Sequence, residues 1–456
     1  MVSDTDLRQS RLSTPTGADS GPPLSAIARQ LLPLTNLPMD QQLEWKRADA
    51  ADALQSVIEQ TPGATLPPVT VVPSPVQIGY RNMCDFVIGA GMDGMLNVGF
   101  TLGPPKSPKN FVEEPTGLKH VNPEVFKAAA ILQEFVRSTR YQCGKVVNGK
   151  PNSPQNRATS QKLFRVARVR TNSAGHVSVI LQATSVGHTP AAVKDGIGRV
   201  SNFFTAQAFK AGLVVKVFGI QMCDASEVKF SPSSPIQFLT GSPCAQLESM
   251  CGITFPILPL SFFRTNMSAA AELYKVIGDW VRIDHGTGTR HVFLELFSGL
   301  GILSTMIANR NDYAKVVAID SDRAAVTISR ALAAAQPTPK SAAIYLLGDV
   351  SSVLPIQLDV LQSESHGQPL EITVVADPSH NGVQAVALRA LRACPSVRRV
   401  VVVATRLRRV QSKFMMLMEP ESAPATVGEP FAITRACVVD TAPWSHEYEV
   451  VVELRR

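Results

Sequence analysis

Apolar residues are spaced differently in the two halves of the chain. In residues 76–256, short alternating or β-branched runs such as 83–90 (MCDFVIGA) and 176–184 (HVSVILQAT) predict strands, and loops rich in proline and serine separate them. From about residue 257, buried strand runs alternate with amphipathic helical runs, starting with the strand at 291–297 (HVFLELF). The second half therefore predicts a doubly wound parallel sheet with helices on both faces.

The segments outside these two patterns complete the expected organisation. Residues 1–35 are rich in Ser, Thr, Pro and Gly and predict a disordered tail, whereas residues 39–60 carry apolar positions on one helical face. Within the β-rich part, residues 122–136 are the one clear helix, with Asn122 as its N-cap. We therefore expect four regions: a tail (1–35), a helix and linker (36–75), a β-rich domain (76–256) and an α/β domain (257–456).

Composition narrows the class of protein. The chain has 456 residues, 45% of them apolar and 18% charged, which excludes a wholly disordered or coiled-coil protein. Its seven cysteines form no Cys-x-x-Cys pair, which predicts a reducing, intracellular compartment and no metal site. Acidic residues near the start make a poor mitochondrial presequence, so the cytoplasm or the nucleus is favoured. The mitochondrion stays open as an alternative. No apolar run approaches the roughly 20 residues that span a membrane.

Residues 294–301 (LELFSGLG) are the most informative local motif. They join a predicted strand to a helix, and their glycines let a ligand approach the backbone beside the helix N-terminus. The next strand ends at Asp320, 21 residues after Gly299, where a carboxylate can accept hydrogen bonds from a ribose diol. A third glycine is missing and Glu295 precedes the loop, which favours the cationic amino-acid moiety of S-adenosylmethionine over NAD.

A structural explanation of the same residues stays open. Glycine is common in any strand-to-helix turn, and an acid at a strand end can simply cap the next helix. If the cofactor interpretation holds, the carboxyl ends of parallel strands border the ligand crevice. The candidate cofactor residues at this edge are Glu295, Gly299, Gly301, Asp320, Asp349 and Asp377.

Positive charge is concentrated in two stretches. The net charge is only +7, yet residues 140–216 contain twelve Lys and Arg and a single acid, Asp195. Arg168 and Arg170 fall on one strand face by the period of two. A run this one-sided favours phosphate contacts and stacking on unpaired bases, and so an RNA partner; a solvated surface over core phenylalanines is the alternative. The interleaved aromatic residues are Tyr141, Phe164, Phe203, Phe204 and Phe209.

Seven motifs, in order along the chain, resemble those of the tRNA (uracil-5-)-methyltransferase family, and of its eukaryotic branch in particular. The resemblance covers about residues 36–456. Each motif is weak alone, and their common order carries the resemblance. The matching segments are 79–86 (GYRNMCDF; family GYRN-K-C-E-F), 98–100, 164–171, 262–266 (FFRTN; family FFQVN), 294–301, 377–382 (DPSHNG; family DPPR-x-G) and 438–456 (family DLFPQT-HVE).

The resemblance implies a fold and a reaction. The fold is α/β, with a C-terminal Rossmann-like class I methyltransferase domain preceded by a β-rich RNA-binding domain. The reaction methylates C5 of a uracil in RNA with S-adenosylmethionine as methyl donor. In the family, a cysteine thiolate adds to C6, the resulting enolate attacks the methyl group, and a glutamate removes the C5 proton. The target base must first leave its stack.

The chain departs from the family where this chemistry is done. At the family's cysteine it has Thr405, whose hydroxyl ionises far less readily than a thiol. Two residues after His446, where the resemblance places the glutamate, it has Tyr448, with Glu447 and Glu449 on either side. Only a one-residue slip, which turns a strand residue to the other face, would restore a carboxylate.

Two further departures concern charge. The family's glutamine in FFQVN, a cofactor contact, is Arg264 here, and a cation at that place would repel a sulfonium. The arginine of DPPR is also lost. These changes predict an RNA-binding protein, with tRNA or rRNA as partner, whose uracil methylation is impaired or lost. The alternatives are an active RNA methyltransferase with altered chemistry and a non-catalytic RNA-binding or ribosome assembly factor.

The resemblance assigns residues to roles. Arg264 joins the cofactor contacts, and Asp377 would orient the uracil. The basic cluster at residues 398–413 flanks the family's catalytic loop and is expected to hold RNA at the mouth of the site. Candidate catalytic residues are Thr405, Glu447, Glu449 and Asp377, and candidate RNA contacts are Arg81, Arg165, Arg168, Arg170, Arg406, Arg408 and Arg409.

Overall fold

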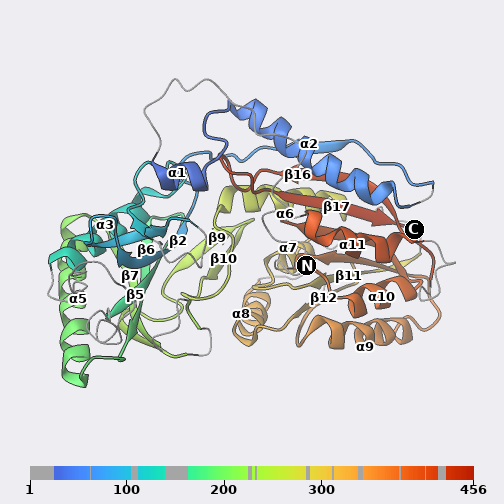
Figure 1. Ribbon diagram of the computed structural model, residues 1–456. Coiled ribbons are helices and arrows are strands. Elements are labelled where there is room, and N and C mark those ends of the chain that lie inside the picture. Colours follow the sequence, from blue (N-terminus) through green and yellow to red (C-terminus); the bar gives the residue numbers. More distant parts are fainter. Residues whose placement is uncertain are drawn as a thin grey trace.

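The structure is a computed structural model of the chain. Two bodies lie side by side, the N-terminal one mostly in cyan to green and the C-terminal one mostly in yellow to red, with the blue helix at residues 39–58 on the C-terminal body (Figure 1). The structure describes residues 25–61, 63–103, 111–138, 163–223, 229–231, 234–283, 288–310, 313–336, 342–378, 382–405, 407–419 and 428–456.

The C-terminal body is built on an eight-stranded sheet in the order β1-β16-β17-β15-β14-β11-β12-β13. β17 is antiparallel to both of its neighbours, and the other pairings are parallel. The central strands are nearly continuous Val, Ile and Leu, as expected of strands buried on both faces. The strands are β1 (Val69–Val72), β11 (Arg290–Leu296), β12 (Lys315–Asp320), β13 (Ala342–Leu347), β14 (Leu370–Ala376), β15 (Val397–Ala404), β16 (Ala432–Val439) and β17 (Glu449–Arg455).

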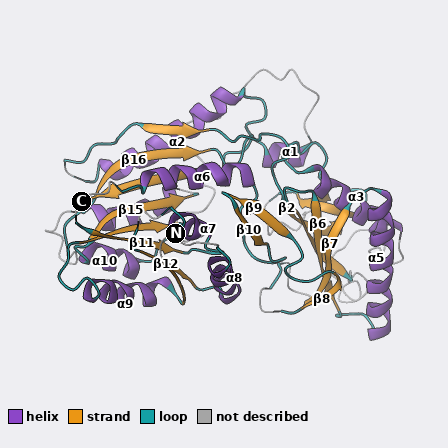
Figure 2. Ribbon diagram, turned by 180° about the vertical axis from the view of Figure 1, so that it is seen from behind, coloured by secondary structure: helices purple, strands orange, loops and turns teal. Residues whose placement is uncertain are grey.

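Helices cover both faces of this sheet (Figure 2). One face carries α2 (Met39–Ile58), α9 (Val350–Ser363), α10 (Ala385–Ala393) and α11 (Leu407–Met418). The other carries α6 (Met267–Trp280), α7 (Ile302–Ala308) and α8 (Arg323–Ala334). The predicted doubly wound architecture is confirmed.

The N-terminal body is a seven-stranded sheet in the order β4-β3-β2-β5-β6-β7-β8, with α1 (Ala26–Leu31), α3 (Pro123–Ser138) and α5 (Pro190–Lys210) packed into one core against it. A β9–β10 hairpin lies between the two bodies (Figure 2). The strands are β2 (Met83–Ala90), β3 (Leu96–Thr101), β4 (Val112–Glu113), β5 (Phe164–Thr171), β6 (His176–Thr184), β7 (Val214–Cys223), β8 (Ile236–Thr240), β9 (Leu247–Met250) and β10 (Ile253–Pro256).

Three expectations about the organisation need correction. Residues 36–75 do not form a separate helix and linker, because α2 packs on the C-terminal sheet and β1 pairs in parallel with β16. Residues 26–31, expected in the tail, form α1. The helix at 122–136 has a second, longer companion in α5, which the sequence hid because Gly196 and Gly198 interrupt its pattern.

Among the described residues, no helix is long and apolar enough to cross a membrane.

Candidate functional site

The predicted site residues gather at the carboxyl ends of the parallel strands, on the side that faces the N-terminal body (Figure 1). Asn82 lies where the two bodies meet, and its backbone N–H donates to the Thr265 carbonyl at 2.9 Å. In open α/β sheets this edge is where ligands bind.

The glycine loop after β11 has the backbone that its sequence predicts. Gly299 and Gly301 have φ of 52° and 66°, a region that favours glycine. A Cβ on Gly301 would lie 2.4 Å from Tyr345 Cε1, so that position admits no side chain without movement. A Cβ on Gly299 would meet nothing within 4 Å, so open space adjoins the loop there. Phe297, with φ of 62°, is strained at the same turn.

Asp320 and Asp349, both predicted as cofactor contacts, have different surroundings. The Asp320 carboxylate accepts the Gly299 N–H at 2.7 Å and the Asp322 N–H at 2.7 Å, which ties the end of β12 to the glycine loop. Asp349 is exposed and caps α9 by accepting the Ser351 N–H at 2.9 Å. Asp320 therefore lies beside the open space at Gly299, whereas the contact of Asp349 is that of an ordinary helix cap.

Glu295 points into the protein. Its Oε2 accepts hydrogen bonds from the Ser304 N–H, at 2.9 Å, and from the Ser304 hydroxyl, in the first turn of α7. The side chain is only 3% exposed, and this burial raises the pKa of the carboxyl to about 8. Glu295 Oε2 already accepts two hydrogen bonds from Ser304, so these contacts do not support the predicted role of Glu295 toward an ammonium group.

We expect Glu295 to make stability depend on pH. Because its pKa rises from 4.5 to about 8 on folding, the folded state favours the protonated carboxyl. That contribution is complete below pH 4.5 and is lost as the pH rises through about 8. Urea unfolding at pH 5 and pH 8.5 should therefore show a smaller loss of stability in Glu295→Gln than in the native chain. Equal losses in the two proteins would contradict this assignment.

Arg264, Asp377 and Glu449 form a buried ionic trio. Arg264 Nη2 lies 2.5 Å from Asp377 Oδ2, and its Nη1 donates to Glu449 Oε1. The three residues come from distant segments: the connector before α6, the end of β14 and the start of β17. Glu449 Oε2 is buried, and no partner for it occurs among the described residues.

The charges of the trio offset one another. Burial opposes ionisation of Arg264, but the two carboxylates outweigh it and raise the pKa of the guanidinium well above its usual range. Burial raises the pKa of Glu449, against the attraction of Arg264. The two carboxylates therefore offset the charge of the guanidinium within the protein. The expectation that Arg264 would repel a sulfonium does not take these two partners into account.

The strand register decides which candidate base faces the site. Glu449 enters the trio, whereas the neighbouring Tyr448 points to the opposite face and donates its hydroxyl to Asp49 on α2 at 2.6 Å. Glu447 is exposed and lies in the loop before β17. Of the two candidate bases, Glu449 is therefore the carboxylate that lies in the trio, and Glu447 lies outside it.

Thr405 immediately follows β15, next to the trio. Ala404 pairs with Val450, and extending this register by one residue brings Thr405 opposite Glu449. Cys394, the cysteine nearest in sequence, ends α10 at the other edge of the sheet. The eight residues of β15 separate it from Thr405 by about 25 Å. Cys394 therefore cannot act in place of the family's nucleophile.

Two of the predicted RNA contacts are structural. Arg168 and Arg170 do share a face of β5, but the connector before α6 covers that face. Arg170 is 1% exposed and donates to the Ser261 carbonyl at 3.0 Å. Arg168 forms a fork with Asp85, with both N–O distances 2.7 Å, and also donates to the Leu260 carbonyl. The prediction that Arg170 binds phosphate is wrong because burial excludes it from a surface ligand.

Arg81 and Arg165 are half-buried and stay candidate RNA contacts. Most of the interleaved aromatic residues are core residues, as the structural alternative predicts. Phe164 and Phe204 are buried and Phe203 packs against the same core, whereas Phe209 is 86% exposed. Tyr141 lies outside the described residues.

The second basic cluster is divided between the two ends of β15, the amino end and the carboxyl end. Arg398 and Arg399 lie at the start of β15, far from Thr405, so the prediction that they line the mouth of the site is wrong. Arg408 and Arg409 are in α11, which follows Thr405, and their side chains are not among those described. Arg406 and residues 379–381 of the DPSH motif lie outside the described residues.

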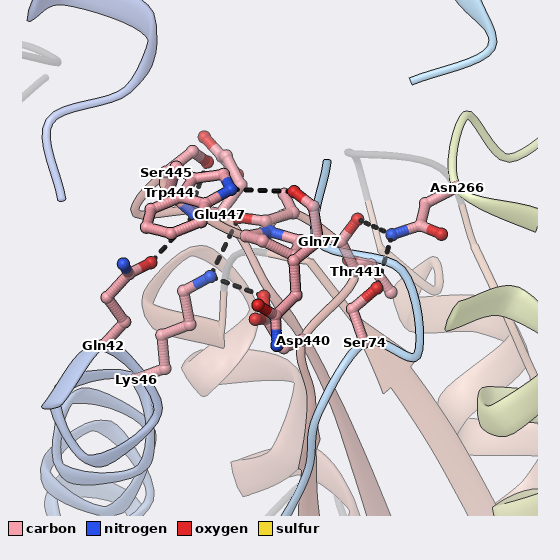
Figure 3. A network of polar contacts seen from close by, with 12 residues as sticks. Gln42, Lys46, Ser74, Gln77, Asn266, Asp440, Thr441, Trp444, Ser445 and Glu447 are labelled. Carbon is pink, nitrogen blue, oxygen red and sulfur yellow. Dashed lines mark hydrogen bonds and ion pairs between the residues drawn. The ribbon is translucent and has the colours of Figure 1, made fainter. Parts of the chain in front are cut away.

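Sequence reasoning missed a polar network beside the trio. Lys46 of α2 is fully buried and its Nζ lies 2.6 Å from Asp440 Oδ1 (Figure 3). The available signal was its position three residues after Leu43 and four before Ala50, on the face that packs against the sheet. A charged residue on such a face needs a buried partner.

The chain is similar to several named proteins. A human protein named tRNA (uracil-5-)-methyltransferase homolog A is 26% identical over 460 residues, which cover 96% of this chain and 69% of the relative. Human tRNA (uracil-5-)-methyltransferase homolog B is 25% identical over 94% of this chain and 84% of the relative. A putative S-adenosylmethionine-dependent methyltransferase structure from Streptococcus mutans aligns with a TM-score of 0.37 at 10% identity, covering 66% of this chain and 73% of that one. No family model matches the chain.

The sheet order, with antiparallel β17 between β15 and β16 and a glycine loop after β11, is that of the Rossmann-like class I methyltransferase fold. Over most of its length the chain is similar to the eukaryotic tRNA (uracil-5-)-methyltransferase homologs A and B, as its sequence motifs predicted.

Proposed function

We propose that this protein binds RNA and S-adenosylmethionine but has lost, or nearly lost, the ability to methylate uracil at C5. The observation that carries the proposal is the place of Thr405. The sequence resemblance assigns the family's nucleophile to this position, which follows β15 and lies opposite Glu449 in the extended register, and the chain carries a hydroxyl there.

The chemistry explains why a hydroxyl does not suffice. C5 of uracil is a poor nucleophile until a group adds to C6, and a thiolate is formed far more readily near neutral pH than a threonine alkoxide. Activation of a hydroxyl requires an adjacent base. Glu449, the carboxylate opposite Thr405, is buried and is paired with Arg264 through Oε1. This pairing holds the carboxylate in place, so it is not free to take a proton from Thr405.

The residues at the glycine loop fit the cofactor in part. Asp320 can accept hydrogen bonds from a ribose diol, because each oxygen uses only one of its lone pairs on a backbone N–H. The open space at Gly299 admits a ligand close to the backbone. Because Asp377 and Glu449 offset the charge of Arg264, the trio is compatible with a sulfonium, which would supply an electrophilic methyl group. We therefore include cofactor binding in the proposal.

RNA binding rests on the family and on the remaining basic residues. Arg81 lies in the GYRN-like segment, two residues before β2, close to the approach of the two bodies. Exposed Lys194 and Lys210 lie on α5 at the far side of the N-terminal body. Phosphate contacts of this kind give binding that weakens with salt.

Binding measurements on the full chain test the proposal. Calorimetry should show S-adenosylmethionine binding that Asp320→Asn weakens about tenfold, the loss of one charge-assisted hydrogen bond. Asp349→Asn, at an exposed helix cap, is the matched control and should bind as the native chain does. Transfer RNA should shift in a gel at 50 mM salt and less at 200 mM. No RNA shift at low salt would contradict the RNA-binding part, and no heat of binding would contradict the cofactor part.

A further inference from the structure

The loop at residues 441–447, between β16 and β17, contacts its own domain (Figure 3) and also the N-terminal body, through Tyr80 and Lys119. At its centre, Trp444 has a left-handed φ of 72°, unusual for a large side chain. Such strain persists only where surrounding contacts fix the backbone. We call this segment the Trp444 loop.

The contacts of Trp444 reach both bodies. Its backbone N–H donates to Gln42 Oε1 on α2 at 2.9 Å, and its carbonyl accepts the Leu34 N–H at 3.0 Å. Its indole N–H donates to the Gln77 carbonyl at 2.7 Å. Lys119 Nζ, from the N-terminal body, lies 3.3 Å from the centre of the ring system, close enough for a cation–π contact.

Neighbouring residues support the same junction. The Tyr80 hydroxyl, from the GYRN-like segment, donates to the Pro443 carbonyl at 2.9 Å. From α2, on the C-terminal body, Lys46 Nζ donates to the Ala442 carbonyl at 2.9 Å. The loop is thus held from two sides, and five residues after Trp444 the chain reaches Glu449.

A second junction ends at the other side of the trio. Arg168 and Arg170 of the N-terminal sheet hold the carbonyls of Leu260 and Ser261, and the connector then leads to Arg264. Asn82 completes this junction through its hydrogen bond to the Thr265 carbonyl. Each junction between the bodies is therefore connected along the chain to a residue of the trio, the first to Glu449 and the second to Arg264.

We infer that the two junctions are coupled through the contact between Arg264 and Glu449, together with the hydrogen bond from Asn266 Nδ2 to the Thr441 carbonyl at 3.1 Å. We also infer that Trp444 is the positioning residue that sets Glu449 in its contact with Arg264. The placement of the N-terminal body then determines the geometry of the site. A ligand that moves this body would change the pairing of Glu449 without touching it.

Hydrogen exchange of the full chain tests the coupling. Trp444→Gly removes the ring and the indole donor, while glycine tolerates the left-handed backbone. We expect about tenfold faster exchange in the peptide that contains Leu34, at the first junction, and in the peptide that contains Asn82, at the second. Peptides from β11 and β14 should exchange as in the native chain. Lys119→Met, a milder change, should move the same two peptides in the same direction.

Trp280→Ala is the matched control, because this tryptophan packs within the C-terminal core and beneath Arg435. It should leave the Leu34 and Asn82 peptides unchanged. Faster exchange at Leu34 alone would overturn the coupling and leave Trp444 a local structural residue. An increase shared equally by the β11 and β14 peptides would overturn it as well, since general loosening would then explain the result.

Discussion

The double variant Thr405→Cys with Arg264→Gln is expected to form C5-methyluridine in RNA, whereas we expect none from the native chain. Cysteine supplies a thiolate at the end of β15, opposite Glu449 in the strand register. Glutamine removes the cation that holds Glu449 Oε1 and Asp377 Oδ2, and it restores the residue that the family has in its FFQVN motif. Both requirements of the reaction, nucleophile and base, are then present.

The single variants separate the two effects. Thr405→Cys alone should give a small activity, because Glu449 remains paired with Arg264, and Arg264→Gln alone should give none. Covalent activation and general-base assistance commonly contribute about a hundredfold or more each, so the double variant should exceed Thr405→Cys at least tenfold. Nucleoside mass spectrometry of tRNA after incubation with S-adenosylmethionine measures the product.

A cysteine one residue earlier is the matched control. Ala404 is 6% exposed and belongs to the core on the α2 side of the sheet, so Ala404→Cys with Arg264→Gln places a thiol on the wrong face. It should form no product. Equal activity of the two double variants would contradict the assignment of position 405.

Lys46→Met is expected to cost about 3–5 kcal/mol in the free energy of unfolding, the usual cost of removing one partner of a buried ion pair. Lys46 and Asp440 are both 0% exposed, and Asp440 Oδ2 has no other partner among the described residues. Burial lowers the pKa of Lys46, against the attraction of Asp440. Without the ammonium, both a buried carboxylate and the Ala442 carbonyl lose their donor.

Two comparisons in urea unfolding check this explanation. Lys46→Met with Asp440→Leu removes both charges and should recover most of the lost stability. Lys127→Met, which breaks the exposed pair with Glu124 on α3, should cost less than about 0.5 kcal/mol. A cost for Lys46→Met as small as that of Lys127→Met would show that the buried pair does not stabilise the fold.

Local patterns predicted much of the fold. The runs at 83–90, 164–171 and 176–184 coincide with β2, β5 and β6, because short runs rich in β-branched and aromatic residues favour strands. The strand-to-helix glycine loop was also predictable, since positive φ angles demand glycine. α5 was missed because packing of the helix against β7 and α3 outweighs the cost of its internal glycines.

The site was less predictable because its residues meet only in the fold. The period of two placed Arg168 and Arg170 on one face, but nothing local showed that the connector covers that face. The choice between Tyr448 and Glu449 depended on the pairing of β17 with β15 and β16. The trio itself joins positions 264, 377 and 449, and its neutralising effect on Arg264 follows from contacts between distant segments.

The most direct test of the central claim is methyl transfer by the native chain itself. Purified full-length protein, S-adenosylmethionine and total RNA are incubated, and the nucleosides are analysed for C5-methyluridine against a blank without protein. We predict no formation above the blank, with RNA and cofactor binding retained. Robust formation of C5-methyluridine that Thr405→Ala abolishes would contradict the claim, because the threonine would then be a working nucleophile.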